Sequence, residues 1–194
     1  MTVVERVFRV LLPTILVFSS GALHAAIPTP ERQALIDLYN STSGSGWAMK
    51  TNWLSPPGTE CTWFGVTCDA PQMHIETIAL NGNNLTGALP PSLGSLTNLT
   101  SLQIDTDNLS GSIPAQLGSL TNLQAIDLNG NQLSGGIPPQ VGSLTNLQSL
   151  TLSGNHAVRK SHQPSVPPFG HQPAQRKHPN APVPASSLVA IDRS

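Results

Sequence analysis

The central part of this 194-residue chain lacks both basic and aromatic side chains. From Ile75 to Asn155 there is no Lys, Arg, Phe, Tyr or Trp, and the four acids are Glu76, Asp105, Asp107 and Asp127. A surface without positive charge is a poor match for phosphate groups, so we expect no nucleic acid partner. The composition instead favours a scaffold of aliphatic and uncharged polar residues.

Sequence signatures of catalysis are also missing. The chain has no nucleophile elbow, phosphate-binding loop, metalloprotease helix or kinase motif. We therefore expect no catalytic residue, no metal and no cofactor, and we predict that the protein is not an enzyme. His74 beside Glu76 could suggest acid–base chemistry, but a solvated pair at a strand edge is the preferred interpretation. Asp105 and Asp107 could suggest a metal site, although the repeat register assigns Asp107 to the interior.

The amino terminus has the order of features found in secretory signals. Arg6 and Arg9 precede an apolar run from Val10 to Phe18, and small residues follow as far as Ala26. The apolar run is shorter than the roughly 20 residues needed to span a bilayer. We predict a signal peptide over residues 1–26 and a secreted, extracellular protein, periplasmic or at the cell surface if the host is bacterial. An uncleaved membrane anchor is the alternative.

Cysteine is scarce, with Cys61 and Cys68 as the only two. In a chain that we expect to be exported, a disulfide between them is the favoured interpretation, and a pair of buried free thiols is the alternative. Two cysteines without a neighbouring histidine pair provide too few ligands for a zinc site. The pair also lacks the two-residue spacing of a redox-active dithiol.

What the middle of the chain does have is a repeat of 24 residues. The block Gly-Ser-Leu-Thr-Asn-Leu starts at Gly94, Gly118 and Gly142. A fixed period of this size indicates a solenoid of stacked coils. Runs such as Leu99-x-x-Leu102-x-Ile104 alternate apolar and polar residues, which predicts a short strand with one face inward. Strands of successive coils should then pair in parallel.

A polar position follows each predicted strand and points toward the interior. It is occupied by Asn83, Asp107, Asn131 and Asn155. An amide can donate and accept hydrogen bonds, so stacked asparagines can satisfy backbone groups of neighbouring coils. A carboxylate cannot donate. The rung at Asp107 should therefore be weaker, or its carboxyl group should be partly protonated by burial.

The pattern Leu-x-x-Leu-x-Leu-x-x-Asn-x-Leu-x-Gly-x-Ile-Pro, followed closely from Leu123 onwards, resembles the plant-type leucine-rich repeat. This resemblance implies an α/β solenoid, a right-handed arc with a parallel β-sheet on its concave face. Cys61-x-Trp63-x-Gly65-Val66-x-Cys68 is similar to the cap that precedes such repeats. The first coil needs such a cover for its outer apolar edge. Thr29-Pro30-Glu31 predicts the start of a helix in this cap, with Thr29 as the capping residue.

The predicted boundaries are a cap over residues 27–73, about three and a half coils over residues 74–155, and a tail over residues 156–194. The repeat pattern stops within the fourth coil. The tail carries seven prolines and four of the six histidines without apolar periodicity, which predicts disorder. A truncated or frame-shifted repeat array would give the same appearance, so a remnant of a longer repeat protein remains an alternative.

Binding is expected on the outward side chains of the concave strand face. These residues are Glu76, Thr77, Ala79, Asn81, Thr100, Ser101, Gln103, Asp105, Gln124, Ala125, Asp127, Asn129, Gln148, Ser149, Thr151 and Ser153. The resemblance implies a protein, peptide or glycan ligand. The face has no Trp, Tyr or Arg, so weak or multivalent contacts are expected. A structural protein that adsorbs to an ordered lattice such as ice or polysaccharide is the second hypothesis. The oligomeric state is left open.

Overall fold

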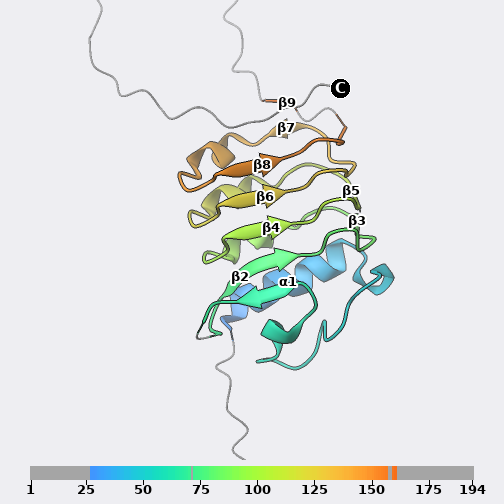
Figure 1. Cartoon of the computed structure of the whole chain (residues 1–194), viewed down its shortest axis with the longest axis vertical. Helices are drawn as coiled ribbons and strands as arrows, with labels where there is room; N and C mark the ends of the chain where they lie inside the picture. Colours follow the sequence, from blue (N-terminus) through green and yellow to red (C-terminus); the bar gives the residue numbers. More distant parts are fainter. Residues whose placement is uncertain (1–26, 71, 157–158, 161–194) are drawn as a thin grey trace, which may run out of the picture.

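One face of the solenoid is a five-stranded sheet in the order β1 (Val66–Cys68), β2 (Ile75–Ala79), β4 (Ser101–Gln103), β6 (Ala125–Asp127) and β8 (Ser149–Thr151) (Figure 1). The computed structural model describes residues 27–70, 72–156 and 159–160. The predicted signal peptide and almost all of the predicted tail lie outside this range. From β2 to β8 the strands are parallel and shift by 24 residues at each step, as the repeat predicts. Strand β1 pairs antiparallel with β2 and was not predicted.

The opposite side of each coil is a short 3₁₀ helix. These helices are η3 (Pro91–Ser95), η4 (Ala115–Ser119) and η5 (Pro139–Ser143). The sequence reading of an extended return segment held by proline was therefore wrong. Each of Pro90, Pro114 and Pro138 is extended only at the residue that precedes the helix. A fixed proline φ suits that position because the chain there has to enter a helical turn.

Two small parallel pairs complete the coils between the sheet and the 3₁₀ helices. Strand β3 (Thr86–Gly87) pairs with β5 (Asn108–Leu109), and β7 (Gly136–Ile137) pairs with β9 (Arg159–Lys160). The shift between β3 and β5 is 22 residues, because the polar rung at Asp107 and its neighbours accept from backbone groups of the preceding coil in that register. The sequence analysis did not foresee these pairs.

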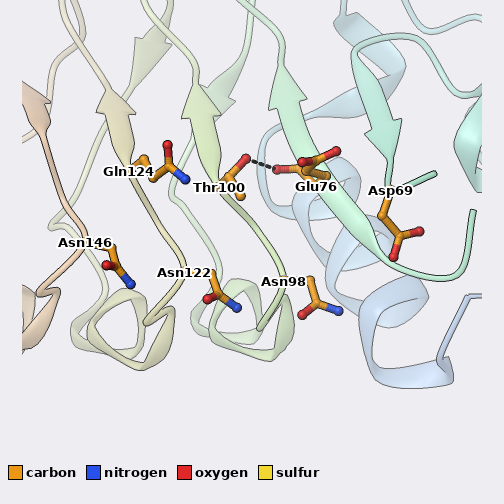
Figure 2. Close-up of a pocket in the computed structure, with 7 residues that line it drawn as sticks. All are labelled: Asp69, Glu76, Asn98, Thr100, Asn122, Gln124 and Asn146. Atoms are coloured by element: carbon orange, nitrogen blue, oxygen red, sulfur yellow. Dashed lines mark hydrogen bonds between the residues drawn. The ribbon is translucent and has the colours of Figure 1, made fainter. Parts of the chain in front are cut away.

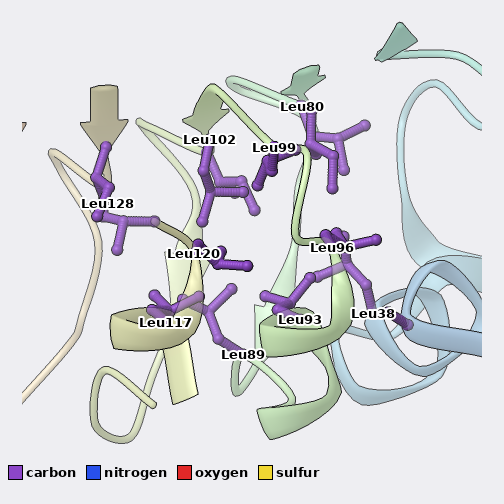
Figure 3. Packing of buried hydrophobic residues seen from close by; sticks show 14 of the residues in the cluster. Leu38, Leu80, Leu89, Leu93, Leu96, Leu99, Leu102, Leu117, Leu120 and Leu128 are labelled. Carbon is purple, nitrogen blue, oxygen red and sulfur yellow. The ribbon is translucent and has the colours of Figure 1, made fainter. Parts of the chain in front are cut away.

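Leucine and isoleucine fill the space between the sheet and the 3₁₀ helices (Figure 3). Leu102, Ile126 and Leu150, which had to point inward if the strand reading was right, are all buried. Leu93 and Leu117 close the opposite side of the core. Each strand alternates buried and accessible positions, so a one-residue slip in register would expose the whole apolar set.

The predicted polar rungs bond to the backbone of neighbouring coils. Asn131 accepts from the N–H of Leu109 at 2.9 Å and donates to the carbonyl of Ile104 at 2.7 Å. Asn155 repeats this arrangement by accepting from Leu133 at 2.9 Å. Asn83 bonds both ways with the backbone of Met49 in the cap, which ties the first rung to the cap. Burial of these amides costs little because their polar atoms are paired.

The cap comprises helix α1 (Thr29–Ser41), two 3₁₀ turns, η1 (Gly44–Gly46) and η2 (Glu60–Thr62), and strand β1. Its core is aromatic: the ring of Trp47 lies 4.8 Å from that of Trp53, and Trp53 lies 5.0 Å from Trp63. The predicted disulfide joins Cys61 to Cys68. Large buried rings supply much apolar area per residue, so few residues suffice to cover the first coil.

Two predictions in the cap were wrong. Helix α1 begins at Thr29 itself, with Pro28 as its N-cap and no side-chain capping bond. His74 does not form a solvated pair with Glu76. Its Nδ1 lies 2.7 Å from Oε1 of Glu31, which is buried and also accepts from the N–H of Ile75 at 2.8 Å. The pair therefore joins the helix to the start of β2. No helix in the described part is long and apolar enough to cross a membrane.

Candidate ligand-binding surface

The strand face consists of the outward side chains of β2, β4, β6 and β8 and the residues next to them. All the residues predicted for this face are at least partly accessible, and none is buried. The constant strand register aligns them in rows across the sheet. Thr77, Ser101, Ala125 and Ser149 form one row. The rows are polar and chemically similar from coil to coil, which suits a ligand that crosses several coils.

A shallow groove of about 440 Å³ runs along the edge of this face where the strands begin (Figure 2). Its lining residues are Asp69, Glu76, Asn98, Thr100, Asn122, Gln124 and Asn146. Glu76, Thr100 and Gln124 were predicted as binding residues, whereas the other four were missed. The groove crosses the sheet from the cap to the fourth coil, perpendicular to the strands.

Asparagines form one side of the groove, and their amides are held in a fixed orientation. Nδ2 of Asn122 donates to the carbonyl of Thr97 at 2.9 Å, and Nδ2 of Asn146 donates to the carbonyl of Thr121 at 2.7 Å. A carbonyl only accepts, so the amide must turn its NH₂ group toward it and leave Oδ1 for another partner. No side-chain Oδ1 bond of either residue is present in the described part of the chain.

The repeat block contains a signal for these asparagines. In Gly-Ser-Leu-Thr-Asn-Leu the first leucine, such as Leu96 or Leu120, is buried, so the core explains why it recurs. The asparagine is half-buried or exposed, and packing does not explain its recurrence. An invariant polar position outside the core is a candidate for binding. The sequence analysis counted only positions within the strands and so overlooked it.

Two carboxylates lie at the cap end of the groove. Oδ1 of Asp69 accepts from the N–H groups of Met73 and His74 at 2.8 and 3.2 Å, which fixes the side chain. The carboxylate of Glu76 is exposed. The two salt bridges within the described residues are Arg32–Glu60 and His74–Glu31, so neither groove carboxylate has a cationic partner there. This end of the groove carries uncompensated negative charge.

The remaining acids divide as the repeat register predicts. Asp105 and Asp127 lie on the strand face, whereas Asp107 is buried. Oδ1 of Asp107 accepts from the N–H groups of Asn83 and Leu85, both at 2.9 Å, but its buried Oδ2 has no partner. Burial raises the pKa of the Asp107 carboxyl group above its usual value. Among the described residues no cluster of three or more histidines, cysteines and acids could hold a metal ion.

Comparisons with known proteins agree with this architecture. The leucine rich repeat N-terminal domain matches residues 28–69, and the leucine rich repeat matches residues 74–96 and 122–144. A probable inactive leucine-rich repeat receptor-like protein kinase of Arabidopsis thaliana is 37% identical over 37% of this chain. The receptor-like serine/threonine-protein kinase FEI 2 of the same plant is 37% identical over 39% of this chain. These matches span 10% and 13% of the two relatives, so they concern only a small part of each kinase.

Solved structures with the same fold include two complexes. The structure of PEPR1-AtPEP1 is 30% identical, with a TM-score of 0.57, and the match covers 64% of this chain and 18% of that chain. The BIR3–SERK2 complex from Arabidopsis thaliana is 35% identical, with a TM-score of 0.53. That match covers 63% of this chain and 67% of the other chain, so it includes most of a related solved domain.

Proposed function

Because this chain belongs to the family of plant-type leucine-rich repeat proteins with an amino-terminal cap, we propose that it is an exported, non-catalytic module that recognises a peptide or a protein. The binding surface is the strand face together with the groove along its edge. The observation that carries the proposal is the division of labour within each coil. The periodic leucines and asparagines are used by the core, and the polar strand residues remain accessible.

The related complexes support a peptide or protein ligand. The solved structures most relevant here are those of PEPR1 with AtPEP1 and of BIR3 with SERK2. Both share the cap-and-coil fold with this chain. Because the chain covers about a tenth of the curated kinases, the proposal concerns the repeat module alone and extends to no kinase activity.

The strand face should bind weakly as a single copy. It lacks the Trp, Tyr and Arg side chains that dominate interface hot spots. Four strands also offer a small area compared with the roughly 800 Å² per partner of a standard interface. We expect a short ligand, or a partner that engages several copies at once.

Selection of random 12-residue peptides displayed on phage tests this function. The purified protein should enrich a related set of peptides. Binding of that set should be lost when Ser101→Arg places a long charged side chain in the centre of the strand face. The matched control is Gln116→Arg, which adds the same side chain at an exposed position of η4 on the opposite side. Equal loss in both variants, or no enriched set, would contradict the proposal.

A second function, adsorption to an ordered polysaccharide surface, is favoured by one specific observation. The serine and threonine of the repeat block are exposed in all three copies and make no side-chain hydrogen bond within the described structure. These residues are Ser95, Thr97, Ser119, Thr121, Ser143 and Thr145. Sedimentation with insoluble cellulose or pectin tests this function. Retention that is lost in Thr121→Lys but kept in Ser101→Arg would favour polysaccharide adsorption over peptide recognition, because the two substitutions lie on different surfaces.

A further inference from the structure

We propose that the groove of Asp69, Glu76, Asn98, Thr100, Asn122, Gln124 and Asn146 binds an extended peptide with a cationic residue against Asp69 and Glu76. This inference rests on the proposed function and names the site and the chemistry of its ligand. The peptide lies along the solenoid axis, across the strands rather than beside one of them. Its backbone N–H groups face the row of asparagines.

The length of the groove sets the length of the ligand. The lining residues belong to or flank β1, β2, β4, β6 and β8, so the groove crosses five neighbouring strands. Adjacent strands lie about 4.8 Å apart, which gives a length of about 19 Å. An extended chain advances about 3.3 Å per residue, so about six residues fill the groove. A ligand of this length matches the small binding area of the module.

Hydrogen-bond acceptors predominate in the groove. Asn122 and Asn146 use their NH₂ groups on backbone carbonyls and present Oδ1. Thr100 donates its hydroxyl proton to the carbonyl of Glu76 at 3.1 Å, which leaves its lone pairs as acceptors (Figure 2). The carboxylates of Asp69 and Glu76 accept only. A complementary ligand is therefore rich in donors, as a peptide backbone with an ammonium or guanidinium group is.

Charge selects the end of the groove at which the cation lies. Asp69 and Glu76 face the cap end, and no Lys or Arg occurs between Ile75 and Asn155 to neutralise them. His74 stands between them in the sequence, but its Nδ1 is directed to the buried carboxylate of Glu31. The other end of the groove is formed by Asn146, which is uncharged. A peptide with its positive residue at one end is oriented by this asymmetry.

Positional-scanning hexapeptide mixtures provide the probe. Each mixture fixes Lys, Arg, Gln or Glu at one position and varies the others. Binding is followed by the side-chain amide NMR signals of Asn98, Asn122 and Asn146 in the ¹⁵N-labelled protein, produced without glycosylation because Asn98-Leu99-Thr100 is a sequon. Mixtures with Lys or Arg at a terminal position should shift these signals at lower concentration than the Gln mixtures do, and the Glu mixtures should be weakest.

Three variants assign the effect to the groove. Glu76→Gln should weaken binding of the Lys and Arg mixtures by about two- to fivefold, the range of an exposed ion pair. Asn122→Ala should weaken all mixtures, because it removes an acceptor from the middle of the row. Asp105→Asn is the matched control. It removes one negative charge from the strand face outside the groove and should leave binding unchanged.

The outcomes separate the site from the general function. If peptides bind with shifts confined to the strand centres and Glu76→Gln has no effect, the groove assignment is overturned while peptide recognition stands. If Glu76→Gln and Asp105→Asn weaken binding equally, a diffuse field rather than a site is responsible. If no mixture binds at millimolar concentration, both proposals fail. Shifts of the three asparagines with a neutral oligosaccharide but with no hexapeptide would assign the groove to glycans.

Discussion

The two ends of the described solenoid solve the same problem differently. At the first coil Ile75, Ile78 and Leu80 are fully buried, because the cap covers them with tryptophans and α1. In the fourth coil Leu150 is 8% exposed, and Leu147 and Leu152 are only partly buried, although their counterparts in the second and third coils are fully buried. Identical repeat residues therefore differ in burial because burial is supplied by the neighbour. We infer that stability falls along the chain from the cap to the fourth coil.

The largest effect is expected where the cap meets the first coil. Trp47 is buried, packs edge-on against Tyr39 and Trp53, and donates its indole N–H to the carbonyl of Thr42 at 3.0 Å. Trp47→Ala should lower the free energy of unfolding by about 3–5 kcal/mol, because it leaves a large cavity and an unpaired carbonyl. Urea unfolding followed by circular dichroism measures this loss.

An exposed residue of the same loop serves as the control for Trp47. Met49 is 49% exposed, and Met49→Ala should change stability by no more than about 0.5 kcal/mol. Comparable losses in the two variants would show that the loop as a whole, rather than the buried indole, stabilises the cap junction.

Equivalent leucines in the middle and at the far end sharpen the comparison further. Leu102 and Leu150 occupy the same repeat position, one strand apart from β6 on either side. Leu102→Ala should cost about 2–5 kcal/mol, as buried leucines do, and Leu150→Ala should cost less, because fewer neighbours enclose it. Hydrogen exchange of the unsubstituted protein should show faster opening of β8 than of β4. Equal costs and equal exchange would refute a gradient of stability along the coils.

The disulfide adds a smaller contribution at the capped end. Cys61 and Cys68 are seven residues apart, so their bond closes a short loop. Replacing both by serine should lower stability by about 2–3 kcal/mol, mainly because the unfolded chain gains freedom. Thermal unfolding of the unsubstituted protein with reductant should reproduce this loss. The same reductant should leave the double variant unchanged, and a further decrease there would point to a different cause.

The sequence determined most of the repeat region and much less of the cap. A period of 24 residues with alternating leucines predicted the parallel register from β2 to β8, since each inward position must lie above its copy. The pairing of β1 with β2 was not predictable, because the cap occurs once and offers no period to align. The contact of Glu31 with His74 was missed for the same reason, since 43 residues separate the two in the sequence.

The candidate groove was only partly predictable because it depends on residues between the regular elements. Glu76, Thr100 and Gln124 follow from strand alternation, whereas Asn98, Asn122 and Asn146 precede the strands. Their orientation is set by backbone carbonyls of the preceding coil, at Thr97 and Thr121. Sequence alone shows that these asparagines recur. Only the stacked coils show that each one is turned by its neighbour to present an acceptor.

The smallest expected effect is a gain of stability within the ladder of inward polar residues. Asn131 donates to carbonyls that lie 27 and 3 residues before it. The equivalent carbonyls for Asp107 are those of Leu80 and Ile104, and its unpaired Oδ2 cannot donate to them while the group is ionised. Asp107→Asn restores the donor and should stabilise the protein by about 1–2 kcal/mol at neutral pH. Thermal unfolding across a pH series measures this gain.

The pH dependence gives this substitution its sharpest test. Desolvation, more than the nearby charge of Asp105, raises the folded-state pKa of Asp107, against the opposing bonds from the backbone. The stabilisation gained from protonation is therefore present below the unfolded pKa and is lost as pH rises through the folded value. The advantage of Asp107→Asn should thus be small in acid and grow toward neutral pH. A gain that is constant with pH would mean that Asp107 does not titrate as a buried rung, whereas Asp105→Asn, at the surface, should change stability by no more than about 0.5 kcal/mol.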